Sequence, residues 1–392
     1  MPPLGGTRTI PVSGPLSAAT GEPVRVLVVD DSRMFRTAVA ESLAGETSLQ
    51  VVGMEANGVR AMEFLKQNPG VDVVTLDLEM PEMDGLATLK AIRELNATRQ
   101  AEREIGVIML SAHTTQGAQS TIAALSNGAF DFITKPNSGS PAESIAELKR
   151  QLPSRIRAFA ARSRRRARMA AAAAAQPPAP AVQPAAQSAV TGARPLLPTR
   201  TGTAQAILIG VSTGGPRALL TLLPRLTALV RLPIIVVQHM PPKFTASLAE
   251  SLNKLCSHKV HEAVDQQPIE PGNTYIAPGG KHLIVRRLGP QQVVCGVNEQ
   301  PPENGLRPNV DVMFRSAAQV WNGNVVAVIL TGMGSDGTKG LGPLKRAGAP
   351  VIVQDEATSV VWGMPGAAVA AGLVDQVLPL DAIPEAVARA AR

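Results

Sequence analysis

The stretch VRVLVVDDSRMFRTAVAESL, residues 24–43, indicates how this chain of 392 residues begins to fold. Its first six residues are a mostly apolar run of the kind that a parallel sheet buries on both faces, and a helical pattern follows from Ser32 to Leu43. Short apolar runs recur at Val73–Leu76, Ile105–Leu110 and Phe130–Thr134, with helical stretches such as Gly58–Gln67 between them. This alternation predicts a doubly wound α/β sheet with right-handed crossovers.

The same alternation starts again at Ala206, so the sequence predicts a second α/β domain. Residues 1–22 are rich in Pro, Gly, Ser and Thr and predict a loose tail. A helix is expected over residues 142–161, and residues 170–198, mostly Ala, Pro, Gln and Val, predict an extended linker. The C-terminal strand candidates are Ala206–Val211, Pro233–Gln238, Thr274–Ala277, His282–Arg286, Gln292–Cys295, Val325–Leu330 and Val351–Gln354.

The net charge of +7 comes from one local cluster. Nine Lys and Arg residues lie between Lys149 and Arg168 with no acid among them, and without these nine cations the net charge would be −2. We expect a solvated helix face there, with contact to an anionic membrane or a receptor array as the alternative. The C-terminal half has no helix-turn-helix pattern and the chain has only ten aromatic residues, so a nucleic-acid partner is not expected.

Cysteine content and hydropathy indicate the cellular compartment in which the protein is expected. The two cysteines, Cys256 and Cys295, form no C-x-x-C pair and cannot build a disulfide framework. No uncharged apolar run reaches the ~20 residues of a membrane span, and the N-terminus lacks a charged start followed by an apolar segment. The sequence therefore predicts a cytoplasmic protein without a membrane span.

Polar residues follow several strands of the first sheet at the ends where ligands of open parallel sheets bind. Asp30 and Asp31 close the first strand, Asp77 follows Val73–Leu76, and Ser111 and Lys135 end two further strands. Three carboxylates in one crevice repel each other, which predicts a Mg²⁺ ion with oxygen ligands and a phosphoryl group accepted by Asp77. The alternative is that each acid caps a helix, the commoner fate of a lone Asp.

These residues resemble those of a response-regulator receiver domain. The matching features, over about residues 24–137, are Asp30–Asp31, the run DLEMPEMDG at 77–85, Ser111-Ala112, Lys135-Pro136 and an aromatic residue at Phe132. The resemblance implies a flavodoxin-like fold, Mg²⁺ held by Asp30, Asp31 and Asp77, and phosphorylation of Asp77 by a chemotaxis histidine kinase. It also implies a switch that rearranges Ser111, Phe132 and Lys135.

A serine, a histidine and an aspartate end three strands of the second sheet. Ser212 follows Ala206–Val211 in a glycine-rich turn, His239 follows Pro233–Gln238, and Asp336 lies just beyond Val325–Leu330. Of the other histidines, His282 begins a strand, His258 and His261 lie in a polar stretch, and His113 belongs to the first domain. Strand ends that deliver a nucleophile, a base and an orienting acid to one rim predict a catalytic triad. A helix cap is the alternative for Ser212 alone.

Two motifs in this half indicate other functions. Gly210-Val-Ser212-Thr-Gly214 fits the G-x-S-x-G pattern of α/β-hydrolases, but the order Ser, His, Asp differs from that family's order. Gly332-Met-Gly-Ser-Asp-Gly337 fits the dinucleotide pattern G-x-G-x-x-G, but Asp336 would put a negative charge where a pyrophosphate should bind. We therefore retain the hydrolase chemistry, reject membership of the α/β-hydrolase family, and keep a dinucleotide site as the less favoured alternative.

The second half resembles the methylesterase domain of chemotaxis response regulators. The matching segments are Ile209–Pro216, Val237–Thr245, Ala277–Gly280, Arg307–Asp311, Leu330–Gly337, Gln354–Ser359 and Gly363–Pro365. The resemblance implies hydrolysis of glutamate γ-methyl esters on methyl-accepting chemoreceptors and deamidation of receptor glutamines. It also implies the triad Ser212, His239 and Asp336, with Thr213 and the amide of Met333 at the oxyanion, and no cofactor in this half.

The sequence thus predicts two doubly wound α/β domains, a flavodoxin-like receiver and a serine hydrolase with a mainly parallel sheet. We expect a tail at residues 1–22, the receiver at 23–140, a basic and Ala/Pro-rich linker at 141–202 and the methylesterase domain at 203–392. A docked receiver would obstruct the esterase site, and phosphorylation of Asp77 should weaken that docking. The chain is expected to be a monomer.

Overall fold

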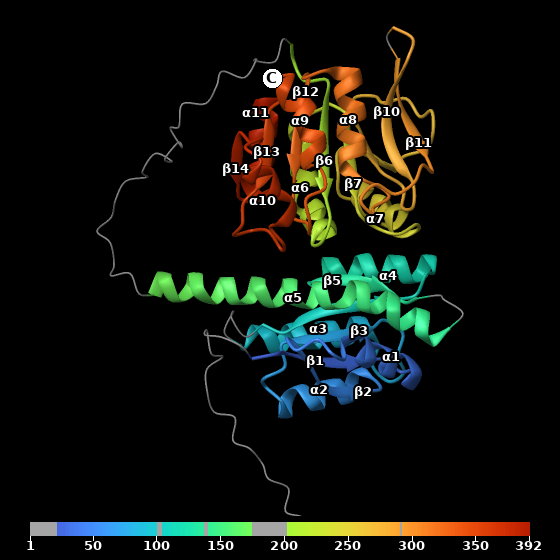
Figure 1. Cartoon of the computed structure of the whole chain (residues 1–392), viewed down its shortest axis with the longest axis vertical. Coiled ribbons are helices and arrows are strands. Elements are labelled where there is room, and N and C mark those ends of the chain that lie inside the picture. The colour runs from blue at the N-terminus through green and yellow to red at the C-terminus, as the bar shows by residue number, and fades with distance from the viewer. Residues whose placement is uncertain (1–21, 100–103, 137–139, 175–201, 291) are drawn as a thin grey trace, which may run out of the picture.

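The computed structural model of the chain describes residues 22–99, 104–136, 140–174, 202–290 and 292–392. Nearly all of the predicted N-terminal tail, and the predicted linker from residue 175 on, lie outside these residues. The two described domains lie one above the other, with the long helix α5 crossing between them (Figure 1). None of the described helices is long and apolar enough to cross a membrane.

The N-terminal domain is a five-stranded parallel sheet in the order β2-β1-β3-β4-β5. Strands β1, β3, β4 and β5 are buried almost throughout, as the apolar runs predicted, because helices cover both faces of the sheet. The elements in chain order are β1 (Val24–Val29), α1 (Arg33–Leu43), β2 (Leu49–Glu55), α2 (Gly58–Gln67), β3 (Val73–Asp77), α3 (Gly85–Ala97), β4 (Gly106–Ser111), α4 (Thr115–Ser126), β5 (Asp131–Thr134) and α5 (Pro141–Ala174).

Helix α5 contains the helix expected over residues 142–161 and extends beyond it. It is one helix of 34 residues and includes residues 170–174, where an extended linker was expected. Its buried side chains Leu148, Leu152, Ile156 and Phe159 complete the core of the N-terminal domain, and Phe159 meets Phe130 edge to face at 5.1 Å between ring centroids. An apolar stripe at helical spacing therefore anchors this helix, and the neighbouring arginines obscured that stripe in the sequence.

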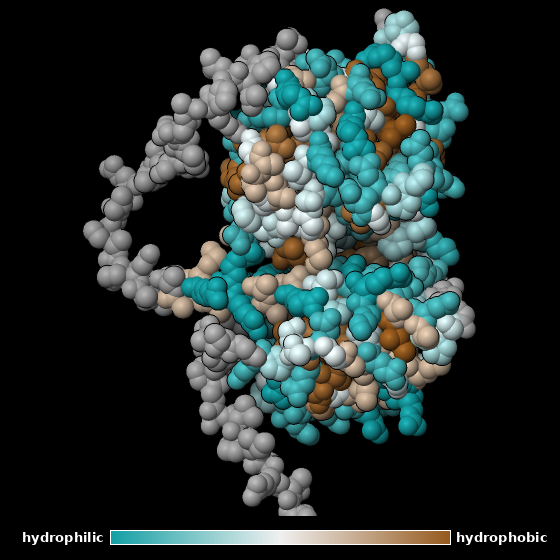
Figure 2. All heavy atoms as spheres, viewed as in Figure 1, coloured by the Kyte–Doolittle hydropathy of each residue, from teal (hydrophilic) through white to brown (hydrophobic). Residues whose placement is uncertain are grey.

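The arginine cluster is not simply a solvated face. Four of its members pair with acids: Arg155 with Asp131, Arg157 with Glu46, Arg165 with Glu356 and Arg166 with Glu104. These acids come from both domains, so helix α5 forms ion pairs with residues that are distant from it in sequence. Figure 2 shows hydrophilic residues along the seam between the domains, with hydrophobic residues beside them.

The C-terminal domain is a seven-stranded parallel sheet in the order β14-β13-β12-β6-β7-β9-β8, with an antiparallel pair, β10-β11, beside it. The predicted α/β fold class is confirmed, with a mainly parallel sheet. The elements are β6 (Ala206–Val211), α6 (Gly215–Leu229), β7 (Ile234–Gln238), α7 (Phe244–Asn253), β8 (Lys259–Glu262), β9 (Asn273–Ile276), β10 (His282–Leu288), β11 (Gln292–Asn298), α8 (Val310–Trp321), β12 (Val325–Ile329), α9 (Thr338–Arg346), β13 (Val351–Gln354), α10 (Gly363–Ala370), β14 (Gln376–Leu378) and α11 (Ile383–Ala390).

The strands β12, β6 and β7 are neighbours at the centre of this sheet and are buried along their whole length. All three run parallel, so their carboxyl ends meet at one edge. The residues that follow them, Ser212, His239 and Asp336, lie 27 to 124 positions apart in sequence. This topology is what brings Ser212, His239 and Asp336 to the same rim.

Candidate functional site

The acidic cluster of the N-terminal domain lies at the carboxyl ends of β1 and β3. Asp30, Asp31 and Asp77 each offer a carboxylate oxygen, and these oxygens lie within 4.8 Å of one another. Lys135, which follows β5, places its Nζ 2.7 Å from Asp30 Oδ2 and 2.8 Å from Asp77 Oδ2. Of the five side chains that the sequence placed at strand ends, the structure brings these four together.

Burial and the neighbouring charges shift the pKa values of the residues in this cluster. It raises the pKa of Asp30 to about 6, against the lowering effect of Lys135, and it also raises the pKa of Asp77. The pKa of Lys135 is raised, because the charges of Asp30 and Asp77 outweigh the opposing effect of burial. A second cation beside these carboxylates would stabilise their charged forms.

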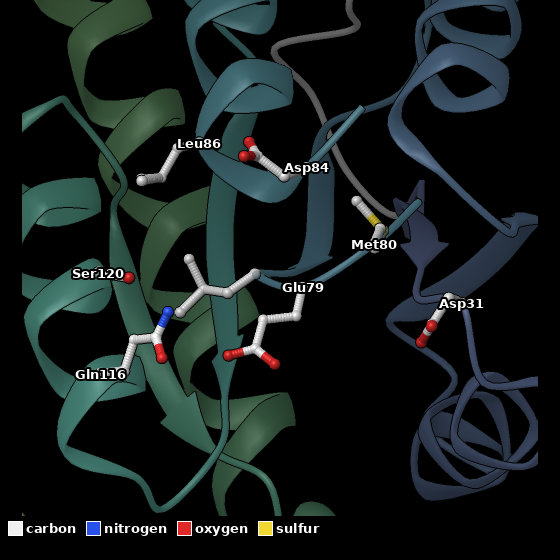
Figure 3. Close-up of a pocket in the computed structure, with 8 residues that line it drawn as sticks. Asp31, Glu79, Met80, Asp84, Leu86, Gln116 and Ser120 are labelled. Carbon is white, nitrogen blue, oxygen red and sulfur yellow. The ribbon is translucent and has the colours of Figure 1, made fainter. Parts of the chain in front are cut away.

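A cleft of about 420 Å³ opens beside this cluster. It is lined by Asp31 and by residues that follow β3 and belong to α3 and α4. Figure 3 shows the side chains of Glu79 and Gln116 extending into the cleft, with Asp31 on its far side. The edge of the sheet that carries the acidic cluster is therefore open to a small molecule or to a partner side chain.

Two of the predicted switch residues have partners outside the acidic cluster. The hydroxyl of Ser111 donates to the carbonyl of Gly117 at 3.1 Å, in the first turn of α4. Phe132 points to the C-terminal domain, where its ring stacks on the ring of Phe244 with centroids 4.8 Å apart and planes 18° apart. The sequence predicted no partner for Phe132, because nothing in an apolar run marks one of its members as an interface residue.

The second candidate site contains the pair His239 and Asp336. His239 Nε2 lies 2.8 Å from Asp336 Oδ2, and the two side chains are 10% and 2% exposed. Since the Asp336 carboxylate accepts this bond, Nε2 is the nitrogen that carries the proton, and Nδ1 is left for another partner. Ser212 follows β6, the strand between the two that carry His239 and Asp336.

The Asp336 carboxylate is held by backbone amides as well as by His239. It accepts hydrogen bonds from the amides of Val310 and Asp311, at the start of α8, and from its neighbour Gly337. Burial raises the pKa of Asp336, but the bond and charge of His239 and these amides outweigh burial and leave the pKa below its ordinary value. The acid therefore stays ionised at neutral pH.

The contacts of Asp336 also bear on the dinucleotide pattern at residues 332–337. The amide of Gly337, which belongs to this turn, donates to the Asp336 carboxylate, and that ionised carboxylate would place a negative charge beside a pyrophosphate. These contacts disfavour a dinucleotide site, as the sequence indicated.

Thr213 and Met333, the predicted oxyanion residues, lie on two turns that flank Ser212. Thr213 is buried in the turn that leads into α6, where Gly214 adopts a φ of +77° that favours glycine. Gly332 lies so close that a Cβ built on it would be 2.9 Å from Ser212 Cβ. The turn that carries Met333 is therefore packed against the serine.

Several site residues were not singled out from the sequence. Gln238 and Thr331 are buried polar residues at the carboxyl ends of β7 and β12, and they bond to the backbone of the Ser212 turn. The buried carboxylate of Asp311 accepts a hydrogen bond from the amide of Gly340, and burial raises the pKa of Asp311 to about 6. The sequence signal for Gln238 and Thr331 is a polar residue at the end of an apolar strand. The sequence prediction used this signal only for residue types that carry catalytic chemistry.

The domains also meet beside His239. Lys243, which precedes α7, donates from Nζ to the carbonyl of His113 at 3.0 Å. His113 lies two residues after Ser111, and α4 packs against α6 and α7. The segment that carries the histidine of the second site therefore contacts the switch region of the first.

Comparison with known proteins identifies the family. Residues 26–146 match the response regulator receiver domain, and residues 207–387 match the CheB methylesterase family. A protein of Trichodesmium erythraeum named protein-glutamate methylesterase/protein-glutamine glutaminase is 42% identical, with 93% of this chain and 98% of that protein covered. The chain belongs to the CheB methylesterase family.

Further relatives carry the same name. A Desulfotalea psychrophila protein is 41% identical, with 92% of this chain and 96% of that protein covered. Among solved structures, the CheB methylesterase catalytic domain of Thermotoga maritima is 42% identical, with 48% of this chain and 99% of that chain covered and a TM-score of 0.46. The family models and the two relatives confirm the predicted membership of both domains.

Proposed function

We propose that this CheB-family chain hydrolyses glutamate γ-methyl esters on methyl-accepting chemoreceptors, and deamidates receptor glutamines, under the control of phosphorylation at Asp77. The observation that carries the catalytic part is the pair His239–Asp336 at 2.8 Å, on strand ends that flank the one bearing Ser212. The names of the relatives, which span both domains, support the substrate.

In the first step, Ser212 Oγ attacks the ester carbonyl as His239 takes its proton. The carbonyl oxygen becomes an oxyanion, for which Thr213 and the amide of Met333 supply donors. His239 then gives the proton to the departing methoxide, so methanol leaves and Ser212 carries the glutamyl group as an ester. Asp336 stabilises the imidazolium form of His239 throughout.

In the second step, His239 takes a proton from water, whose oxygen attacks the acyl carbonyl. Ser212 leaves as the alcohol and recovers its proton from His239, and the receptor keeps a free glutamate. The same steps with ammonia as the leaving group convert glutamine to glutamate.

Mg²⁺ fits the cluster of Asp30, Asp31 and Asp77. Three carboxylates supply the hard oxygen donors that this ion prefers, and burial makes their charges costly without a cation. When bound, Mg²⁺ neutralises charge on the phosphoryl group that Asp77 accepts. Lys135 already contacts both Asp30 and Asp77, so it is placed to hold the same group from the other side.

The interdomain contacts support control by phosphorylation. Phe132 stacks on Phe244, and Lys243 bonds to His113, so the receiver's switch face covers the segment that follows His239. A chemotaxis histidine kinase is the expected donor, and a cleft lined by Asp31 opens beside the acidic cluster. Rearrangement of Ser111 and Phe132 after phosphorylation would weaken this docking and open the esterase site to a receptor helix.

Methanol release from methylated receptor membranes tests the catalytic part. The wild type should release methanol, and Ser212→Ala should reduce the rate to background while retaining the wild-type unfolding temperature. The conversion of receptor glutamines, followed by mass spectrometry, should disappear in the same variant. A Ser212→Ala chain that releases methanol at the wild-type rate would overturn the proposed function.

A further inference from the structure

Gln238 joins the two residues that perform proton transfer in the proposed reaction. It is the last residue of β7, directly before His239, and its side chain is 1% exposed. Its Nε2 donates to the carbonyl of Ser212 at 3.0 Å and to the carbonyl of His239 at 3.2 Å. One buried amide thus bridges the backbone of the nucleophile and the backbone of the base.

The other end of this amide is packed into the first turn of α6. Gln238 Oε1 is buried and has no hydrogen-bond partner within the part of the chain that the structure describes. A Cβ built on Gly215 would lie 1.9 Å from this oxygen, so only glycine leaves room for it. A buried acceptor without a partner is costly, and an apolar residue of similar size would avoid that cost if packing were the only role.

We infer that Gln238 is a positioning residue that sets the separation of Ser212 Oγ from the His239 ring. It touches neither the substrate nor the reacting atoms, and it acts through the two carbonyls that it holds. Glycine at position 215 is required because it admits the Gln238 amide. This inference rests on the proposed function of Ser212 and His239.

Gln238→Met tests the inference, because methionine keeps the length of the side chain and lacks the amide. We expect kcat for methanol release to fall ten- to a hundredfold with KM unchanged. The rate at which a fluorophosphonate labels Ser212 should fall in parallel, a readout that needs no receptor. The control Asn253→Leu removes an amide contact to Val260, at the far end of α7, and should leave both rates unchanged.

Gly215→Ala supplies an independent test. It should displace the Gln238 amide and lower kcat, and it should cause much less further loss when combined with Gln238→Ala, which removes the contacts at 1.9 and 2.9 Å and leaves only Val211 Cγ2, at 2.7 Å, near the new methyl group. The role of Gln238 would be overturned if Gln238→Met were labelled and turned over substrate at the wild-type rates. It would also be overturned if the losses of kcat in Gly215→Ala and Gln238→Ala multiplied in the double variant. A wild type that the fluorophosphonate does not label would instead overturn the proposed function.

A second inference rests on a different contact, between α5 and the loop of residues 355–362. Arg165 of α5 pairs with Glu356 at 3.1 Å and donates to the carbonyl of Ser359 at 3.0 Å. Val360 of the same loop packs against the apolar cluster that α5 shares with the receiver sheet. The loop therefore holds the receiver by an ion pair and by an apolar contact.

The same loop also touches both turns that flank Ser212. A Cβ built on Gly214 would lie 2.5 Å from Val360, so the valine is packed against the nucleophile turn. Val361 accepts from the amide of Gly332 at 2.9 Å and donates to Thr331 Oγ1 at 3.0 Å. Helix α5 and the oxyanion turn are thus linked by one short loop.

We propose that Arg165 forms a latch that holds the receiver on the oxyanion side of the esterase site, separately from the contact of α4 with α7 near His239. The proposal deepens the proposed phosphorylation control and rests on it. Opening of the docked chain then requires that both contacts be released.

Arg165→Gln in the full chain should raise methanol release in the absence of a phosphodonor about threefold, with the fully phosphorylated rate unchanged. Glu356→Gln should raise the basal rate in the same direction, and the double variant should be no more active than Arg165→Gln alone. Arg168→Gln, an exposed arginine on the same helix, is the matched control.

Three results would overturn the latch: an unchanged rate in Arg165→Gln, additive effects of the two substitutions, or an equal rise in Arg168→Gln. These three results count against the latch when the wild type responds to acetyl phosphate. A wild type that does not respond to acetyl phosphate would overturn the phosphorylation control on which the latch depends.

Discussion

Replacing Lys243 by methionine should raise the activity of the unphosphorylated chain. The ammonium group donates to the His113 carbonyl at 3.0 Å across the domain interface, and the lysine is exposed. Bonds from charged donors contribute about 1.5–3 kcal/mol when buried, and solvent screening reduces this one to about 1 kcal/mol. Loss of about 1 kcal/mol shifts the docking equilibrium about fivefold toward the open form, since 1.4 kcal/mol is a factor of ten.

The assay is methanol release from methylated receptor membranes by the full chain, with and without acetyl phosphate and Mg²⁺. Lys243→Met should raise the basal rate about fivefold and leave the stimulated rate unchanged, because the stimulated chain is already undocked. Lys254→Met, a change at an exposed lysine just past the other end of α7, is the control. An unchanged basal rate, or equal changes in the basal and stimulated rates, would refute the reasoning.

Three further predictions follow from the site geometry. Asp336→Asn should lower kcat about a thousandfold or more, because the amide cannot stabilise protonated His239, and steady-state methanol release measures this. Asp311→Asn should unfold at a higher temperature than the wild type above pH 6 and at a similar temperature near pH 4. Burial raises the pKa of Asp311 to about 6, so the native state binds more protons than the unfolded chain between pH 4 and 6, and wild-type stability falls as pH rises through that window. Asp31→Asn should weaken Mg²⁺ binding at least tenfold by calorimetry, because it removes one of three carboxylates.

The strands and the site residues at their ends were predictable from the sequence because fully buried parallel strands leave a clear signal. Ser212, His239 and Asp336 each follow such a strand, and the common direction of parallel strands brings their ends to one edge. Strand β2 (Leu49–Glu55) was not predicted, since it lies at the edge of its sheet and most of its residues are only half-buried.

The contacts between the domains could not be predicted in the same way. The stacking of Phe132 on Phe244 and the pair Arg165–Glu356 join residues more than a hundred positions apart, and no local periodicity encodes such pairs. A helix was expected over residues 142–161, but its packing against the receiver through Leu148, Leu152 and Ile156 was not predicted. Long-range packing decided each of these features.

The most direct measurement is the effect of acetyl phosphate with Mg²⁺ on methanol release by the wild type and by Asp77→Asn. The substitution removes the phosphoryl acceptor and keeps the size of the side chain. We predict that the phosphodonor raises the wild-type rate and leaves the low rate of Asp77→Asn unchanged. An equal response of the two chains, or a wild type that releases methanol at one rate under both conditions, would contradict control of Ser212 through Asp77.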